Sequence, residues 1–170
     1  MGDPVHHRYR RGERENVEAN RWSGQVHVWW AINPDFKIKP VIISENLNSA
    51  RYVQVLGQRT AMLKKRGYIL QQDNAPSHRA KGTKEWLAEK HITVLKDWPA
   101  QSADLNPIEN AWATINTAVQ KRRVNSVTEF EAVVQDEIQK FSQATVRSLC
   151  NSMPSRLEAV IAAGGRATKY

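Results

Sequence analysis

The sequence of 170 residues predicts an α/β domain built on a mixed sheet, and three features support this fold class. Near the start, apolar residues alternate with their neighbours, as they do in a strand. Further along, apolar residues recur at helical spacing, and the predicted elements follow the order hairpin, helix, strand, helix, strand and helices. The length suits one domain with a core, and no run of eighteen apolar residues could span a membrane.

The first predicted elements are an irregular polar arm at 1–23 and a β-hairpin. The alternation of Gln25–Ile32 predicts the first strand, and Phe36–Ser44 is predicted to be the second. Asn33-Pro34-Asp35 has the residue types of a turn. Pro40 places the second strand at an edge of the sheet, because proline cannot donate to a central ladder.

The middle of the chain predicts two helices and two short strands. Asn48 or Ser49 can cap a helix that continues to Gly67. The elements expected after it are a strand at Tyr68–Gln72, a helix at Ser77–Lys90, a strand at Ile92–Leu95 and a loop at Trp98–Asn106.

The last third of the chain is predicted to be helical. The first helix there carries one apolar stripe, made of Ile108, Ala111, Trp112, Ile115 and Val119. Ser126 and Glu129 have capping-box spacing ahead of the next helix. Pro154 marks the end of a further apolar group, and Gly164-Gly165 is a C-cap pair for the last helix.

The charge of the chain favours a polyanionic partner. Lys and Arg number 25 against 17 Asp and Glu, which leaves a net charge of +8. Contact with phosphates would release condensed counterions, although a solvated positive face explains such a charge equally well. Cys150 is the single cysteine, so no internal disulfide can form, in agreement with a reducing compartment. The polar N-terminus lacks the apolar stretch of a secretory signal.

Two carboxylates lie at predicted element boundaries. Asp73 ends a strand and Glu109 begins a helix. Phosphodiester chemistry commonly uses two Mg²⁺ ions, which prefer hard oxygen ligands. Each residue also has a structural interpretation: Asp73 precedes the turn-like Asn74-Ala75-Pro76, and Glu109 is third in a helix that Asn106 could cap, with Pro107 first. The spacing alone does not decide between these interpretations.

Two long blocks of sequence carry a resemblance to a known family. QQDNAPSH at Gln71–His78 and WPAQSADLNPIENAW at Trp98–Trp112 closely resemble the second and third catalytic blocks of Tc/mariner-type DDE transposases. GQVHVWWAI, which begins at Gly24, is similar to the hairpin strand that follows the family's first active-site strand. SMPSRLEAVIAAGGRATKY at Ser152–Tyr170 resembles the family's C-terminus. The resemblance therefore predicts a partial DDE transposase domain at 24–170.

The resemblance implies an RNase H-like fold, a mixed sheet flanked by helices, with a helical C-terminal end. In this family three acids bind two divalent metal ions, Mg²⁺ or Mn²⁺, for DNA cleavage and strand transfer. Carried over to this chain, Asp73 is the second acid and Glu109 the third, each as a catalytic residue and a metal ligand. The implied partner is DNA, as transposon ends and as target. The wording of the two blocks looks more like that of eukaryotic relatives and implies a nuclear protein.

Three departures from the family pattern affect this prediction. Ala103 stands where the family usually has proline, and Lys96 is an extra residue that lengthens the interval between the two acids by one. The third departure is larger, because no apolar strand that could carry the first acid precedes the hairpin. We therefore expect the catalytic domain to be truncated at its first strand and to hold two of the three acids. The family's helix-turn-helix DNA-binding region is also expected to be missing.

Other acidic residues do not replace the first acid. Asp3 follows only Met-Gly, Asp35 lies in a turn, and Glu13, Glu15 and Glu18 lie in a charged arm. The missing acid is the one expected to bridge both metal ions, and the loss of the first strand would expose an inner sheet edge. We therefore expect weak metal binding, no strand transfer by the chain alone, and a tendency to associate.

Three functional hypotheses follow from the sequence. The first is a remnant or fragment of a DDE transposase that is inactive alone. The second is a domesticated, non-catalytic module that binds nucleic acid or protein on the same scaffold. The third is a nuclease whose missing acid comes from another chain, so that activity would need a homo-oligomer or a second protein.

Further residues are expected to support the acids from outside the metal site. Asn74 and Asn106 would shape the backbone beside Asp73 and Glu109. His78 would approach the substrate or the metal ions, with a surface or capping role as the alternative.

Aromatic and basic residues are weaker candidates for nucleic-acid binding. Trp98 could shape its loop or stack on a base. Lys121, Arg122 and Arg123 could contact phosphate, although cations at a helix C-terminus also complement the helix dipole.

Overall fold

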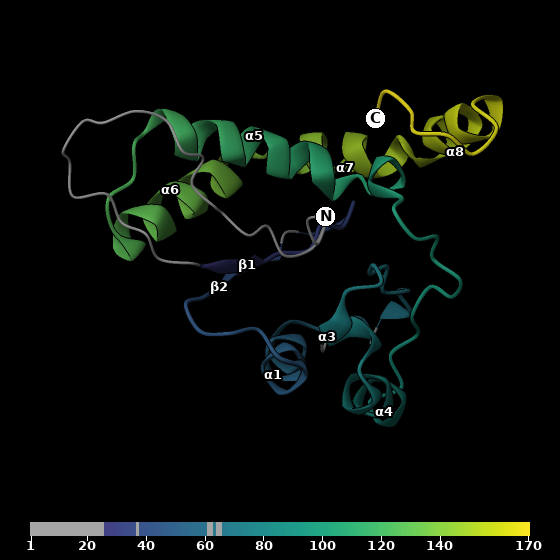
Figure 1. The fold of residues 1–170 in the computed structure, drawn as a ribbon, viewed down its shortest axis with the longest axis horizontal. Helices are drawn as coiled ribbons and strands as arrows, with labels where there is room; N and C mark the ends of the chain where they lie inside the picture. Colours follow the sequence, from purple (N-terminus) through teal and green to yellow (C-terminus); the bar gives the residue numbers. More distant parts are fainter. Residues whose placement is uncertain (1–25, 37, 61–62, 64–65) are drawn as a thin grey trace.

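A computed structural model describes residues 26–36, 38–60, 63 and 66–170, so the predicted arm at 1–23 lies outside the described residues. The molecule has three layers, with a β-hairpin between two groups of helices (Figure 1). Strand β1 (His27–Trp29) pairs antiparallel with β2 (Val41–Ile43). The predicted hairpin is confirmed, but both strands are shorter than expected.

Strand β1 is buried on both faces. Val26, Val28 and Trp30 belong to a core cluster with the helices on one side. Trp29, which points the other way, belongs to a second cluster with the helices on the opposite side. The alternation in the sequence predicts a strand with one apolar face, whereas this strand is covered on both faces. β1 is therefore the central layer of the domain.

Helix α1 (Ser49–Arg59) begins as predicted, because the side chain of Asn48 accepts a hydrogen bond from the Arg51 amide at 2.9 Å. It was expected to continue to Gly67 but ends at its cap, Thr60. The Thr60 hydroxyl and the Thr60 amide both donate to the Leu56 carbonyl, at 2.6 and 2.8 Å.

The two predicted short strands are reduced to a single parallel bridge. Leu70 pairs with Val94, where the Leu70 amide donates to the Thr93 carbonyl at 2.8 Å and the Leu95 amide to the Leu70 carbonyl at 2.9 Å. The described residues thus contain a two-stranded antiparallel sheet and, outside its strands, one parallel bridge.

The single helix predicted at 77–90 is wrong, because two helices occupy this range. Helix α3 (Pro76–Arg79) and helix α4 (Lys81–Glu89) are separated by Ala80, whose ψ of 142° is extended. The Thr83 hydroxyl donates to the Ser77 carbonyl at 2.7 Å and holds the two helices across this break.

The predicted apolar stripe is confirmed in helix α5 (Ile108–Lys121), which packs against helix α6 (Val127–Lys140). The short 3-10 helix η1 (Ala103–Leu105) forms within the predicted loop. Ser126 caps α6 by accepting from the Glu129 amide at 3.1 Å, while the Glu129 carboxylate accepts from the Asn125 amide at 2.7 Å. The capping box is therefore present, with its return bond one residue earlier than expected.

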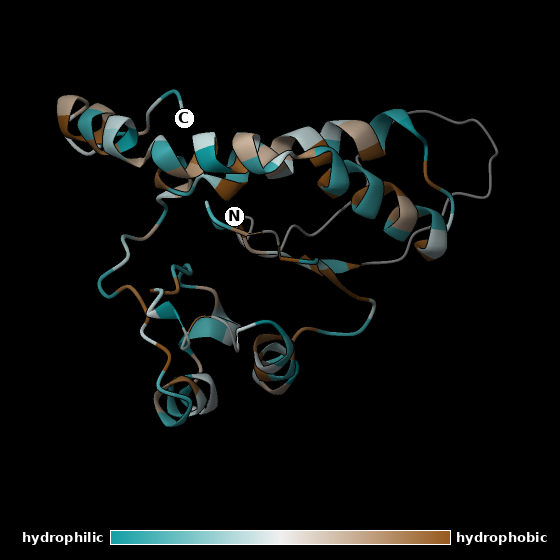
Figure 2. Ribbon diagram, turned by 180° about the vertical axis from the view of Figure 1, so that it is seen from behind, coloured by the Kyte–Doolittle hydropathy of each residue, from teal (hydrophilic) through white to brown (hydrophobic). Residues whose placement is uncertain are grey.

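Helices α7 (Gln143–Asn151) and α8 (Met153–Ala162) complete the fold at one end of the molecule. Gly164 and Gly165 have φ values of 62° and 77°, which confirms the predicted C-cap pair. Figure 2 shows hydrophobic and hydrophilic residues mixed along α8. Within the described ranges, no helix has the length and hydropathy that a membrane crossing needs.

Candidate active site

Asp73 is a buried carboxylate just after the Leu70 bridge. Its side chain is 8% exposed, and Oδ1 accepts a hydrogen bond from the Ala75 amide at 3.1 Å. The same oxygen lies 2.5 Å from Nδ1 of His78. The turn interpretation of Asp73 is therefore correct but incomplete, because an imidazole also binds the carboxylate.

His78 is buried rather than exposed. It lies on α3, is 2% exposed, and its ring centroid is 4.3 Å from that of Tyr52. Nδ1 faces two acceptors, the Asp73 carboxylate and, at 3.3 Å, the Asp73 carbonyl. Nδ1 therefore carries the proton, and the imidazole holds the carboxylate in one orientation.

Tyr52 and Gln72 extend this arrangement, and sequence reasoning did not identify either as a site residue. The Tyr52 hydroxyl donates to Oε1 of Gln72 at 2.7 Å, so α1 is tied to the residue before Asp73. The sequence placed Tyr52 among the apolar positions of its helix. No local pattern could indicate a partner twenty residues away.

Glu109 is in the first turn of α5, where the positive end of the helix dipole favours a carboxylate. It is the second residue of the helix rather than the third, because Pro107 is the N-cap. The Glu109 amide donates to the Asn106 carbonyl at 3.1 Å, and no side chain caps this helix. The side-chain cap expected of Asn106 is therefore not formed, while the capping role of the Glu109 carboxylate stays a prediction.

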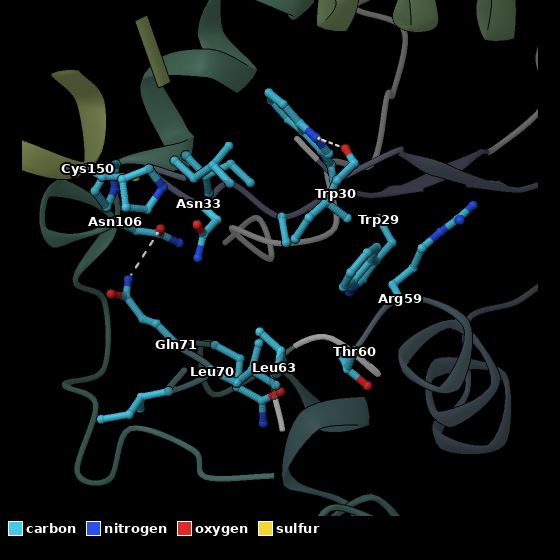
Figure 3. A pocket seen from close by; sticks show the side chains of 18 of the residues that line it. Trp29, Trp30, Asn33, Arg59, Thr60, Leu63, Leu70, Gln71, Asn106 and Cys150 are labelled. Atoms are coloured by element: carbon cyan, nitrogen blue, oxygen red, sulfur yellow. Dashed lines mark hydrogen bonds between the residues drawn. The ribbon is translucent and has the colours of Figure 1, made fainter. Parts of the chain in front are cut away.

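The two predicted blocks meet through hydrogen bonds between their side chains and backbone. Oδ1 of the buried Asn106 accepts from Nε2 of Gln71 at 3.4 Å, a bond drawn in Figure 3. Nδ2 of Asn74 donates to the Trp98 carbonyl at 2.9 Å. The residues beside Asp73 are thereby tied to the loop and helix that carry Glu109.

A pocket of about 250 Å³ lies beside this junction (Figure 3). The end of the hairpin, Trp29–Pro34, lines one side, and Ile69–Gln72 lines another. Asn106–Ile108, just before Glu109, and Cys150 also line the pocket. The pocket is thus bordered by the residues that immediately precede each acid.

The candidate ligands are of the chemical type that a divalent cation prefers, but they are too few for a complete site. Asp73 and Glu109 offer the hard carboxylate oxygens that Mg²⁺ prefers. Across 26–36, 38–60, 63 and 66–170, however, no three Asp, Glu, His or Cys side chains group as a metal site would need. These residues can therefore provide part of a metal site but not a complete set of acids.

The basic residues at the end of α5 are remote from Glu109. Lys121 follows Glu109 by twelve positions along the helix, which corresponds to a rise of about 18 Å. Nη2 of Arg122 lies 2.8 Å from both Asp136 Oδ2 and Glu137 Oε1 on α6. The hydrogen bonds from Arg122, and then from Lys140, lower the pKa of Asp136. Arg122 thus joins α5 to α6, while Lys121 and Arg123 are exposed.

The tryptophans of the third block differ in their surroundings. Trp112 is 0% exposed and packs edge-to-face on Trp30 at 5.8 Å between centroids, so its predicted core role is confirmed. Trp98 is half-buried in the loop, where its backbone binds Asn74. Its suggested stacking on a base stays a prediction.

Comparison with protein families gives a match over most of the chain. A family model described as DDE superfamily endonuclease matches residues 3–131. This range includes both Asp73 and Glu109, and it begins within the part of the chain that the structure does not describe.

Several transposases of nematodes are similar in sequence. The transposable element Tcb2 transposase of Caenorhabditis briggsae is 39% identical over 105 residues, which cover 62% of this chain and 38% of the relative. The Tc3 transposase of Caenorhabditis elegans is 31% identical over 157 residues, covering 89% of this chain and 47% of the relative. The chain thus spans less than half the length of these relatives.

Solved structures of the Mos1 mariner transposase have the same fold. Its catalytic domain, in a structure with raltegravir and Mg, superposes with a TM-score of 0.74 at 25% identity, covering 85% of this chain and 77% of that one. The Mos1 strand transfer complex gives a TM-score of 0.75 at 25% identity, over 94% and 48% of the two chains. The predicted RNase H-like fold is therefore confirmed.

Proposed function

We propose, for a chain that belongs to the DDE superfamily endonuclease family, a function in DNA transposition, with Asp73 and Glu109 as two carboxylates of the catalytic site. The observation that carries this proposal is the junction of the two blocks. Gln71 and Asn106 join the residues beside Asp73 to the helix start that carries Glu109. The junction borders a pocket, as a substrate site would.

The residues of the chain would prepare these carboxylates before any ligand arrives. The Ala75 amide and His78 Nδ1 hold the Asp73 carboxylate in one orientation. Tyr52 in turn packs against the His78 ring and restricts its movement. Glu109 is held by a helix start and not by a flexible loop.

A divalent ion, Mg²⁺ or Mn²⁺, would supply Lewis-acid chemistry for phosphodiester cleavage when bound. Asp73 and Glu109 are the residues that would contribute ligands. Because the described residues do not provide a third acid beside them, we expect weak binding and no cleavage or strand transfer by the 170-residue chain alone.

The proposed partner is DNA. The net charge of +8 favours a polyanion, and the similar Mos1 transposase has been solved as a strand transfer complex. A nuclear location follows from this proposal, since the DNA of a eukaryotic host is found there. Association with further copies of the chain is also proposed, because it offers a route to a third acid.

Titration of Mn²⁺ into the purified chain, followed by calorimetry, tests the site. We expect weak binding by the wild type and its loss in Asp73→Asn and in Glu109→Gln. Glu85→Gln, which changes an exposed acid on α4, is the matched control and should bind as the wild type does. Unchanged binding in both site variants would show that these carboxylates are not ligands.

The same experiment separates the proposal from a non-catalytic module. The incomplete group of acids in the described residues is the observation that favours such a module. The non-catalytic function is supported if neither the wild type nor the variants bind Mn²⁺ while the wild type still binds a DNA duplex in EDTA. Fluorescence anisotropy measures the DNA binding. Cleavage of DNA by the pure chain with Mn²⁺ would instead refute the expected inactivity.

A further inference from the structure

Helix α8 is attached to the rest of the molecule through an arginine. Of its ten residues, Arg156 is the buried one, with 2% of its surface exposed. Its apolar residues Leu157 and Ile161 are 48% and 77% exposed. A buried guanidinium is costly unless its donors are paired. The hydrogen bonds of Arg156 therefore take part in the docking of α8, while Leu157 and Ile161 remain exposed.

The acceptors of Arg156 lie on both sides of Glu109 in the sequence. Nη1 donates to the Asp104 carbonyl in η1 at 2.7 Å, and Nη2 donates to Oδ1 of Asn110 in the first turn of α5. Nε donates to the Ser152 hydroxyl at 2.8 Å within the start of α8. One rigid guanidinium thus spans the loop before Glu109 and the residue after it.

The final segment of the chain covers this arginine. The Thr168 amide donates to Oδ2 of Asp104 at 3.1 Å, so both the backbone and the side chain of Asp104 are held. The Tyr170 ring lies 4.7 Å from Cζ of Arg156. Burial lowers the pKa of the guanidinium, and the charges of Tyr170 and then of Asp104 oppose this change.

We propose that Arg156 is a positioning residue for Glu109, which it serves by clamping Asp104 to Asn110 and so fixing the direction in which α5 begins. On the other side of the same segment, Gln71 holds Asn106. The orientation of Glu109 is thus set from two sides. A carboxylate that binds a ligand together with a second residue needs such a fixed position. This inference rests on the proposed function, in which Glu109 belongs to the site.

The alternative role of Arg156 is that of an anchor for α8 alone. The two roles differ in which segments lose stability when Arg156 is changed. An anchor affects α8 and the segment that follows it. A positioning residue also loosens the loop before Glu109 and the first turn of α5.

Amide hydrogen exchange, resolved by NMR on the full 170-residue chain, distinguishes these roles. Arg156→Lys keeps the positive charge but loses the planar guanidinium that binds two acceptors at once. In this variant we expect the amides of Leu105, Asn106 and Glu109 to exchange about tenfold faster or more. Amides of α6 should keep their protection. Arg147→Lys, at an exposed position on α7, is the control and should change nothing. Faster exchange confined to α8 would overturn the proposal.

A second pair of variants tests the clamp at an exposed position, where the fold is not at risk. Asn110→Ala removes the acceptor and should loosen the first turn of α5, whereas Asn110→Asp keeps an acceptor and should retain protection. Equal protection in Asn110→Ala and the wild type would overturn the clamp. These measurements need no metal ion. Failure of Mn²⁺ binding would therefore overturn the proposed function while exchange still reports on Arg156.

Discussion

The two candidate acids are held in different ways. Asp73 is fixed largely by its own motif, because Ala75 and His78 lie within five residues of it. Glu109 depends on distant parts of the chain, because the residues around it are bound by Gln71 and Arg156. A short sequence block can therefore carry the geometry of Asp73, whereas that of Glu109 is a property of the folded domain.

Removal of the Trp112 side chain, which lies on the same helix as Glu109, should have the largest effect on stability. Trp112→Ala empties a fully buried position on α5, next to Trp30, and should lower the free energy of unfolding by about 3–5 kcal/mol. Urea denaturation of the purified chain measures this loss. Trp98→Ala, at the half-buried loop position, is the matched control and should cost clearly less. Equal losses would mean that Trp112 does not anchor the helix of Glu109.

Removal of the imidazole beside Asp73 should have an intermediate effect. His78→Ala removes the imidazole that binds the buried Asp73 carboxylate, and should cost about 1–3 kcal/mol in the free energy of unfolding. Arg79→Ala, at the exposed neighbouring position on α3, provides the control. If His78→Ala were as stable as the wild type, local contacts would not be what holds Asp73.

The bond that joins the two acids' segments should have the smallest effect. Gln71→Leu and Asn106→Leu each remove one partner of this hydrogen bond. A double-mutant cycle should give a coupling free energy of about 0.5–1.5 kcal/mol between the two positions. Thermal or urea unfolding of the four proteins measures it. Additive effects of the two substitutions would show that the segments meet without depending on this bond, and the contrast between the acids would be weaker.

Several features of the fold are predictable because they depend on near neighbours in the sequence. The alternation in the hairpin, the apolar stripe of α5 and the cap of α6 by Ser126 all involve residues within a few positions of each other. Predictions failed where the backbone left the helical conformation within an apolar pattern that continues. Helix α1 ends at Arg59, with Thr60 as its cap, and the extended backbone of Ala80 divides one expected helix into α3 and α4.

The sequence also identified Asp73 and Glu109 as candidates, through motif wording and through their predicted element boundaries. It did not indicate that His78 is buried against Tyr52, that Asn106 binds Gln71, or that Arg156 reaches Asp104 and Asn110. Each of these contacts joins residues that are from 26 to 52 positions apart or lie on separate elements.

The sequence by itself thus determined the class of fold, the order of the elements and the chemical type of the candidate site, because periodicity, caps and motifs are read from neighbouring residues. The tertiary structure alone decided that β1 is buried on both faces and that an arginine of α8 binds the residues flanking Glu109. The physical reason is that burial and long-range hydrogen bonds depend on which surfaces meet when the chain folds, and no local pattern records that choice.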